Sequence, residues 1–140
     1  MRKKKLVVDH QIDFIIWGLV STAKDYKLAW KINQTLTIDL VKQDDLVISF
    51  VKGNDLRVSN YLFTTENTEL RLLKNRGEGS ESATYLAPEQ QQFDYFVMLK
   101  TDDDTLDQAS VQEALKQVDV VDYLVLVDLE KLKSRDNFIF

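Results

Sequence analysis

The stretch FIIWGLV, from Phe14 to Val20, is a continuous run of aromatic, β-branched and other apolar residues. A run of this length without a polar position predicts a β-strand that is buried on both faces, at the centre of a sheet. Ser21 or Thr22, which follow at once, offer a side-chain oxygen to cap a helix. Over residues 23–36 the apolar side chains recur at helical spacing, which predicts an amphipathic helix with its apolar stripe in the core. The stripe consists of Tyr26, Leu28, Ala29, Trp30, Ile32 and Leu36.

After this helix the hydrophobic period changes to two, which is typical of strands with one buried face. Residues 46–51 alternate in this way, and Gly53-Asn54-Asp55 supplies the residue types of a turn. Residues 57–64 and 69–74 predict two further strands, and short connections make neighbouring strands antiparallel. Residues 75–82 contain two glycines and two serines, so they predict a loop.

The C-terminal part repeats a strand–helix pattern. Phe93–Leu99 predicts another nearly continuous apolar strand, and Thr105 can cap the next helix with Gln108 as the second half of a capping box. The apolar face of that helix consists of Val111, Ala114, Leu115 and Val118. Val120–Leu129 predicts a closing strand. Residues 121–127 match residues 93–99 in pattern, and the helix between them leaves room for a crossover, so the two strands could lie parallel in one sheet.

These elements predict the fold class. A chain of 140 residues has the length of one ordinary domain. We therefore expect a single α+β domain over residues 1–140, with a largely antiparallel sheet of six to seven strands and two helices packed on one face. A ferredoxin-like arrangement with an inserted hairpin is one candidate topology.

Composition excludes several classes of function. The chain has no cysteine, which excludes disulfides, thiolate catalysis and nearly every structural zinc site. His10 is the single histidine, so no histidine cluster can hold a metal, and the four glycines form no phosphate-binding motif. We therefore predict no catalytic residues, no metal and no cofactor, and we lean toward a protein that is not an enzyme.

Charge is unevenly distributed along the chain. The net charge is −5. Residues 1–76 carry 13 basic and 9 acidic groups, whereas residues 77–140 carry 5 basic and 14 acidic groups. The two halves could attract each other within the fold or between subunits, or they could form separate solvated patches. The acidic total makes nucleic acid an unlikely partner, because phosphate binding needs Lys and Arg gathered on one face.

The basic run Arg2-Lys3-Lys4-Lys5 before Leu6-Val7-Val8 imitates the start of a signal peptide. Asp9 and Asp13 interrupt any apolar core that could follow it. The chain also lacks the roughly 18 consecutive apolar residues that a membrane-spanning helix requires. We therefore expect a soluble cytoplasmic protein without a membrane partner.

Three residues form a candidate ligand-binding site. Arg76, at a predicted strand end, has a guanidinium that can bind a carboxylate or phosphate through two hydrogen bonds. The alternative is that Asn75 and Gly77 make a turn while Arg76 pairs with a nearby acid. Glu89 and Asp94 precede or begin the next apolar strand, so Arg76, Glu89 and Asp94 could converge around a pocket at the strand ends.

Two carboxylate groupings allow further readings. Asp94 and Asp122 both stand at predicted strand starts, where they could form an acid–base pair or anchor neighbouring backbone amides. Asp102-Asp103-Asp104 could hold a hard cation, but we favour its interpretation as the solvated entry to a helix.

Several stretches resemble the small bacterial IPExxxVDY family. The residues that carry the resemblance are Ala87-Pro88-Glu89-Gln90-Gln91-Gln92-Phe93-Asp94-Tyr95, with Ala87 and Phe93 in place of the family's Ile and Val. Matching stretches also occur at residues 24–30, 75–77 and 129–134. The resemblance implies a cytoplasmic single-domain protein, and it assigns no catalytic or binding residue.

These observations favour a non-catalytic interaction module, with self-association or a protein partner. The apolar tail Phe138-Ile139-Phe140 must dock on its own domain or on a partner. The alternative function is a small-ligand binding protein or enzyme that uses Arg76, Glu89 and Asp94.

Overall fold

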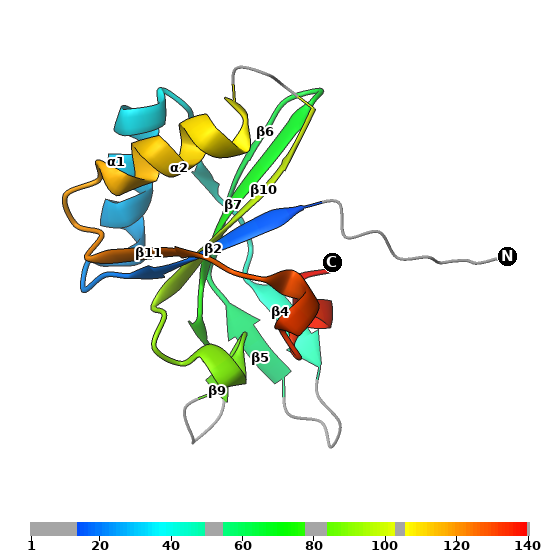
Figure 1. Cartoon of the computed structure of the whole chain (residues 1–140). Coiled ribbons are helices and arrows are strands. Elements are labelled where there is room, and N and C mark those ends of the chain that lie inside the picture. The colour runs from blue at the N-terminus through cyan, green and yellow to red at the C-terminus, as the bar shows by residue number, and fades with distance from the viewer. Residues whose placement is uncertain (1–13, 50–54, 78–83, 103–105, 140) are drawn as a thin grey trace, which may run out of the picture.

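A computed structural model describes residues 14–49, 55–77, 84–102 and 106–139. Its main element is a six-stranded antiparallel sheet with the order β11-β2-β10-β7-β6-β3 (Figure 1). The strands, in this order, are β11 (Tyr123–Leu126), β2 (Ile15–Val20), β10 (Tyr95–Thr101), β7 (Thr68–Lys74), β6 (Asn60–Thr64) and β3 (Val41–Lys42). The predicted α+β class and the largely antiparallel sheet are therefore confirmed.

The topology of the central strands follows from their order along the chain. The elements run β2, α1 (Asp25–Leu36), β7, β10, α2 (Gln108–Lys116) and β11, and the sheet order of the four strands is β11-β2-β10-β7. This is the β-α-β-β-α-β arrangement of ferredoxin-like proteins. The hairpin of β4 (Leu46–Ser49) and β5 (Asp55–Val58) is inserted between α1 and β7, as one candidate topology proposed.

The two strands with matching sequences do lie parallel in one sheet. Both β10 and β11 pair with β2 in the antiparallel sense, so they run in the same direction on either side of it. Their connection contains α2, which provides the expected crossover. Strand β2 is buried on both faces as predicted, but it lies second from the edge of the sheet rather than at its centre.

Side chains of β2 contribute to two separate cores. Trp17 and Leu19 pack with the buried residues of the two helices, and Trp17 Nε1 donates a hydrogen bond of 3.0 Å to Gln112 Oε1 on α2. Ile16 points to the other face of the sheet, together with Phe14, the residue just before the strand. Figure 1 shows both helices on one side of the sheet, with the β4–β5 hairpin and the C-terminal segment on the other. The sheet is therefore the middle of three layers.

The second face is covered by short elements. They are the β4–β5 hairpin, the hairpin of β8 (Arg76–Gly77) and β9 (Thr84–Tyr85), and three 3₁₀ helices: η1 (Pro88–Gln90), η3 (Leu129–Lys131) and η4 (Arg135–Phe138). Their buried apolar residues include Leu56, Val58, Leu129 and Phe138. The sequence predicted part of this layer, since the period of two over residues 46–51 indicated the strand β4. It did not predict the β8–β9 hairpin or the 3₁₀ helices, because these segments are too short to show a period.

The prediction for the first helix was partly wrong. Leu28, Ala29 and Ile32 are buried, but Tyr26 is 66% exposed and Trp30 is 55% exposed. Tyr26 and Trp30 lie four residues apart and share a face that turns away from the sheet, since a helix on a sheet buries only one stripe. The helix is preceded by Lys24 as N-cap, without a side-chain cap, so neither Ser21 nor Thr22 caps it.

The second helix begins later than predicted. Asp107 is its N-cap and accepts a hydrogen bond from the amide of Ser110. The proposed capping box of Thr105 and Gln108 is therefore wrong, and Thr105 itself lies outside the described residues. Val111 and Leu115 are buried as expected.

The C-terminal strand is shorter than predicted, since β11 ends at Leu126 and Leu129 belongs to η3. Beyond it the chain folds back under the sheet. Phe138 is fully buried, and its ring meets the ring of Phe96 edge-to-face with the centroids 5.2 Å apart. The tail therefore docks on its own domain at Phe138, whereas Phe140 lies outside the described residues.

Candidate interaction site

An apolar groove runs beside β11 on the sheet face that the helices leave uncovered; we call it the β11 groove. Its volume is about 710 Å³. Four lining residues belong to the second core or pack against it: Val20, Phe93, Val127 and Leu132. Three more come from the strand itself: Tyr123, Val125 and Leu126. The remaining four are polar or charged: Gln90, Gln92, Asp128 and Lys131. An apolar groove of this size with a few polar groups is typical of binding sites.

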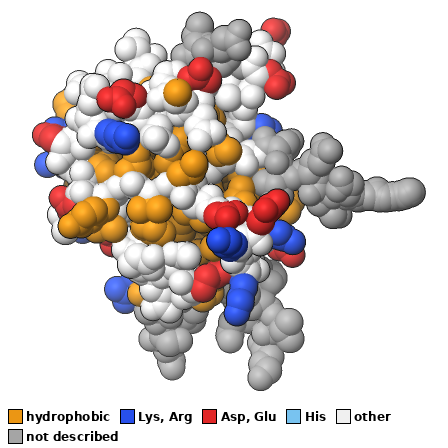
Figure 2. Space-filling view, viewed as in Figure 1, with side chains coloured by type: hydrophobic (Ala, Val, Ile, Leu, Met, Phe, Trp, Pro, Cys, Tyr) orange, Lys and Arg blue, Asp and Glu red, His pale blue; other side chains and the backbone are white. Residues whose placement is uncertain are grey.

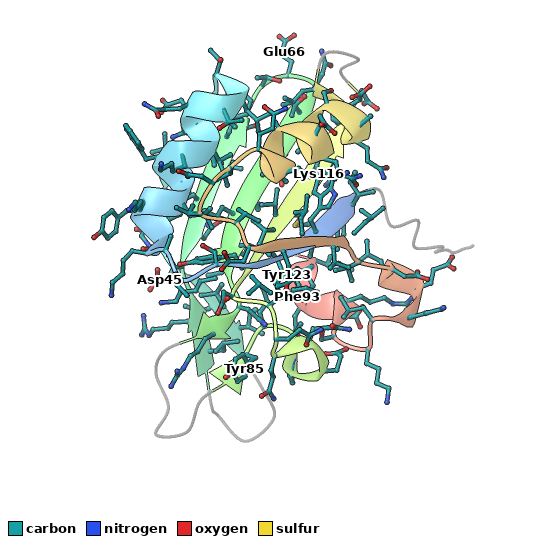
Figure 3. All side chains as sticks on the ribbon, turned by 60° about the vertical axis from the view of Figure 1, so that its left-hand side comes forward. Asp45, Glu66, Tyr85, Phe93, Lys116 and Tyr123 are labelled. Atoms are coloured by element: carbon teal, nitrogen blue, oxygen red, sulfur yellow. The ribbon has the colours of Figure 1, made fainter. Side chains whose placement is uncertain are left out.

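The strand that borders the groove exposes large apolar side chains. Tyr123 is 69% exposed, Val125 46% and Leu126 45%. Figure 2 shows hydrophobic side chains in a band across the face of the molecule that β11 crosses in Figure 1. Figure 3 shows Tyr123 and Phe93 close together, and both line the groove. A contiguous apolar patch on a protein surface marks a site of interaction.

A glycine in β2 gives Phe93 its place in the groove. A Cβ atom added to Gly18 would lie 2.5 Å from Cδ2 of Phe93, which is closer than any real contact. The ring therefore lies directly against the backbone of β2, as glycine in a strand permits. Phe93 also packs edge-to-face against Phe96, with ring centroids 5.8 Å apart.

Asn75 holds the segment that carries Phe93. It is completely buried, and its Nδ2 donates hydrogen bonds of 2.9 Å to the carbonyl oxygens of Gln90 and Phe93. Its Oδ1 accepts a 2.9 Å hydrogen bond from the amide of Ala87. Its own amide bonds to the carbonyl of Asp94, and its carbonyl accepts from the amide of Leu86. Asn75 is thus a buried side chain with every polar group satisfied, and it fixes one wall of the groove.

The backbone of β11 presents a strand edge. β11 is the last strand in the sheet order, and among the described residues no strand pairs with its outer side. The amide of Val127 donates to the carbonyl of Ile16 on β2 at 2.9 Å. Successive residues of a strand alternate in direction, so the amides and carbonyls of Leu124 and Leu126 point away from β2. Such an edge is a template for pairing with another chain.

Charged groups lie near both ends of the β11 groove. At the Tyr123 end, the exposed Asp122 directly precedes β11, and its amide bonds to the carbonyl of Val20. The carboxylate of Asp94 accepts a 2.9 Å hydrogen bond from the amide of Ser21 on the opposite side of β2, where β10 lies, so Asp94 is separated from Asp122 by that strand. At the opposite end Asp128 faces Lys131, with Oδ2 and Nζ 4.0 Å apart. Asp122 therefore adds a negative charge at the Tyr123 end, whereas the charge of Asp128 is balanced by Lys131.

The three residues of the predicted ligand site make different contacts. Arg76 lies on β8, where it is exposed and paired in register with Tyr85. The carboxylate of Glu89 accepts a 2.7 Å hydrogen bond from the amide of Ser134. Asp94 binds the amide of Ser21, which supports the anchoring role proposed for it. None of the three lines the β11 groove.

Hydrogen bonding determines the ionisation of Glu89. Burial raises the pKa of its carboxyl, but hydrogen bonds from its own amide and from the amide of Ser134 outweigh burial and hold the pKa below its usual value of 4.5. Glu89 is therefore a charged anchor for the C-terminal segment. The backbone thus takes up part of the hydrogen-bonding capacity of the Glu89 carboxylate, and that part is not available to a ligand.

A cluster of polar groups joins α1 to the edge of the sheet opposite β11, where β6 and β3 lie. Ser59 Oγ donates to Asp25 Oδ2 at 2.7 Å, and Lys42 Nζ donates to Ser59 Oγ at 2.7 Å. Lys42 also lies over the ring of Tyr61, with its Nζ 5.2 Å from the ring centroid. Tyr95 donates its hydroxyl to the carbonyl of Ala23 at 2.6 Å, and burial raises its pKa. These groups satisfy one another, so we assign the cluster a structural role.

A polar hollow of about 280 Å³ lies at the opposite end of the sheet, where β6 turns into β7 and β10 ends. Its lining includes Asp102, whereas Asp103 and Asp104 lie outside the described residues. Across the described ranges, no three acidic, histidine or cysteine side chains gather as metal ligands would. No helix in the described part of the chain is long and apolar enough to cross a membrane.

No protein-family model matches the chain, and no curated protein matches it. The resemblance to the IPExxxVDY family therefore stays a prediction. Tyr123 and Val125 were predicted to lie in a closing strand, but their exposure was not predicted, because a sequence pattern does not reveal which strand is the edge. The acidic residues that flank this strand, Asp122 and Asp128, were the available signal, since charges often border edge strands.

Proposed function

We propose that this protein is a non-catalytic interaction module that binds a protein partner through the β11 groove. The observation that carries the proposal is the combination of a strand edge that no strand of the described residues pairs with, exposed apolar side chains and an adjoining apolar groove. Burying these side chains against a partner is favourable by about 25 cal/mol for each Å² removed from water. The cytoplasmic location and the membership of the IPExxxVDY family belong to the same proposal, on the strength of the sequence resemblance.

A small-ligand site at Arg76, Glu89 and Asp94 is the second reading. It ranks lower because the carboxylates of Glu89 and Asp94 each accept a backbone hydrogen bond that fixes local structure. Self-association is a special case of the proposed function in which the partner is another copy of the chain.

The test is site-specific photo-crosslinking in the cells that produce the protein. A photoreactive phenylalanine analogue replaces Tyr123 in one variant and Tyr26, which is equally exposed but lies on α1, in a matched control. We expect a discrete crosslinked partner from position 123 alone. Its purified form should bind the wild-type protein and bind Val125→Glu at least tenfold more weakly. Identical crosslinking from positions 123 and 26 would contradict the proposal.

A further inference from the structure

We propose that the occupant of the β11 groove is an extended protein segment that adds to the sheet as a seventh strand beside β11. The segment carries apolar residues at alternate positions and a Lys or Arg at the end that meets Asp122. This inference rests on the proposed function and specifies its partner class. Strand addition of this kind combines main-chain hydrogen bonds for affinity with side-chain contacts for specificity.

The backbone geometry supports pairing by an extended segment rather than by a helix. Leu124 and Leu126 direct their amide and carbonyl groups outward, on the side where no strand of the described chain pairs. β11 has four residues, which corresponds to about 13 Å of strand. A segment of about five or six residues covers this length. A docked helix would leave the outward backbone groups of Leu124 and Leu126 without partners.

The side chains of β11 determine which pattern of apolar and polar residues the bound segment needs. Side chains of paired strands lie next to each other on each face, so alternate residues of the segment would contact Tyr123 and Val125 on the groove side. Beyond these two side chains the groove continues over Phe93 and Leu132. Apolar, β-branched or aromatic residues at alternate positions fit this surface, because they favour strand geometry and fill an apolar groove.

Charge favours a basic residue at one end of the segment. Asp122 is exposed and directly precedes β11 at the Tyr123 end of the groove. At the other end, the charge of Asp128 is offset by Lys131. A Lys or Arg at the Tyr123 end would therefore pair with the carboxylate of Asp122, and one at the opposite end would gain less.

The same charges disfavour a second copy of the chain as the occupant. In a twofold pairing through the outward groups, Leu124 of one copy would pair with Leu126 of the other. That register places Asp122 opposite Asp128 of the second copy. Lys131 of that copy already pairs with its own Asp128, so the second copy offers Asp122 another carboxylate in place of a basic residue. A partner with a basic end supplies the countercharge that a second copy does not.

The test begins with a library of random decapeptides, displayed on phage and selected on the purified full-length protein. Peptides that also bind Val125→Glu are removed by counter-selection. We expect the enriched peptides to alternate apolar and polar residues and to contain Lys or Arg at one end. Asp122→Lys should weaken the best peptide at least tenfold. Glu66→Lys, a charge reversal at the far end of the molecule in Figure 3, should leave its affinity unchanged.

Amide hydrogen exchange then tests the pairing itself. With the best peptide bound, the amides of Leu124 and Leu126 should exchange at least tenfold more slowly, whereas the amide of Val125, which points to β2, should change little. Enriched peptides with helical spacing, or binding without protection of Leu124 and Leu126, would overturn strand addition and leave the interaction function standing. Protection of these amides in the free protein would also overturn the proposal, since the chain itself would then occupy the edge. No enrichment at all, together with no specific crosslink from position 123, would refute the proposed function as well.

Discussion

Two residues determine the shape of the groove although neither is part of its surface. Asn75 holds the backbone of Gln90 and Phe93, and Gly18 leaves room for the Phe93 ring. From the sequence, Asn75 had the appearance of an ordinary turn residue beside Arg76, because Asn is common in turns. Its importance comes from contacts with residues 11 to 19 positions further along the chain, and no local pattern reports such contacts.

Replacing Asn75 with Ala should strongly destabilise the protein. The buried carbonyl of Phe93 would lose its donor, the partly buried carbonyl of Gln90 would lose one of its two donors, and the buried amide of Ala87 would lose its acceptor. The free energy of unfolding should therefore fall by about 3 kcal/mol. Urea denaturation followed by circular dichroism measures the change. Asn67→Ala, at an exposed turn position, is the matched control and should change the free energy by less than about 0.5 kcal/mol. Similar values for the two variants would refute the role assigned to Asn75.

Substitution of Gly18 by Ala tests the contact with Phe93. The added methyl group must displace the ring, which should lower the free energy of unfolding by about 1–3 kcal/mol. The same substitution in a Phe93→Leu background should cost less, because the smaller side chain can give way. A double-mutant cycle measures this coupling. Additive effects would show that Gly18 is needed for another reason.

Among the elements, the strands and helices with a strong period were predictable and the short ones were not. The apolar runs that became β2 and β10 and the stripes of α1 and α2 identified the helix-covered half of the molecule. The exposure of Trp30 could not be read from its sequence, because the apolar stripe of α1 is wider than the face that the sheet covers. The caps were mispredicted because Ser21 bonds the carbonyl of Val120 instead of capping α1.

The start of α1 should make stability depend on pH. Burial raises the pKa of Asp25, but hydrogen bonds from Ser59 and the amide of Tyr26, with the charge of Lys42, outweigh burial and hold the pKa below its usual value of 3.8. A carboxyl with a lowered pKa in the folded state stabilises the protein above its unfolded pKa. This stabilisation is lost as the pH falls from about 4 through the lower folded pKa.

Chemical denaturation at a series of pH values measures this loss. Wild-type stability should decline below pH 4 more steeply than that of Asp25→Asn, which has no proton to take up at this position. Asp44→Asn, at an exposed position, should keep the wild-type slope. Equal slopes for the wild-type protein and Asp25→Asn would contradict the assignment.

At the scale of the whole molecule, the sequence predicted a sheet with one layer of helices. This prediction describes only half of the structure, because the sheet has a core on each face. The other half is the second core, closed by the C-terminal segment, and the sequence indicated only that the tail is apolar. Which surface it would cover depends on where the chain returns after β11, and sequence periodicity carries no information on that point. The candidate site lies at the junction of the second core with the sheet edge, so it could not be located from the sequence either.

Phe138 is the residue on which this closure depends. Phe138→Ala should lower the free energy of unfolding by about 3–5 kcal/mol, because the ring is completely buried against Phe96. Ile139→Ala, at a site that is 59% exposed, is the control and should have little effect. Thermal melting also tests the segment as a whole: a chain that ends at Arg135 should melt at a lower temperature. An unchanged melting temperature would refute docking of the tail on its own domain.

The position of β2 between two cores affects how the molecule unfolds. Trp17 points into one core and Ile16 into the other, so neither outer layer can detach without exposing buried side chains of the same strand. The two layers are thereby coupled through one piece of backbone, and the molecule should lose its structure in a single cooperative transition. The residues in and just after β11 share this coupling, since Leu124 packs against one core and Val127 against the other. A partner that bound only the folded chain at this edge should therefore raise the melting temperature of the whole molecule and not of one layer alone.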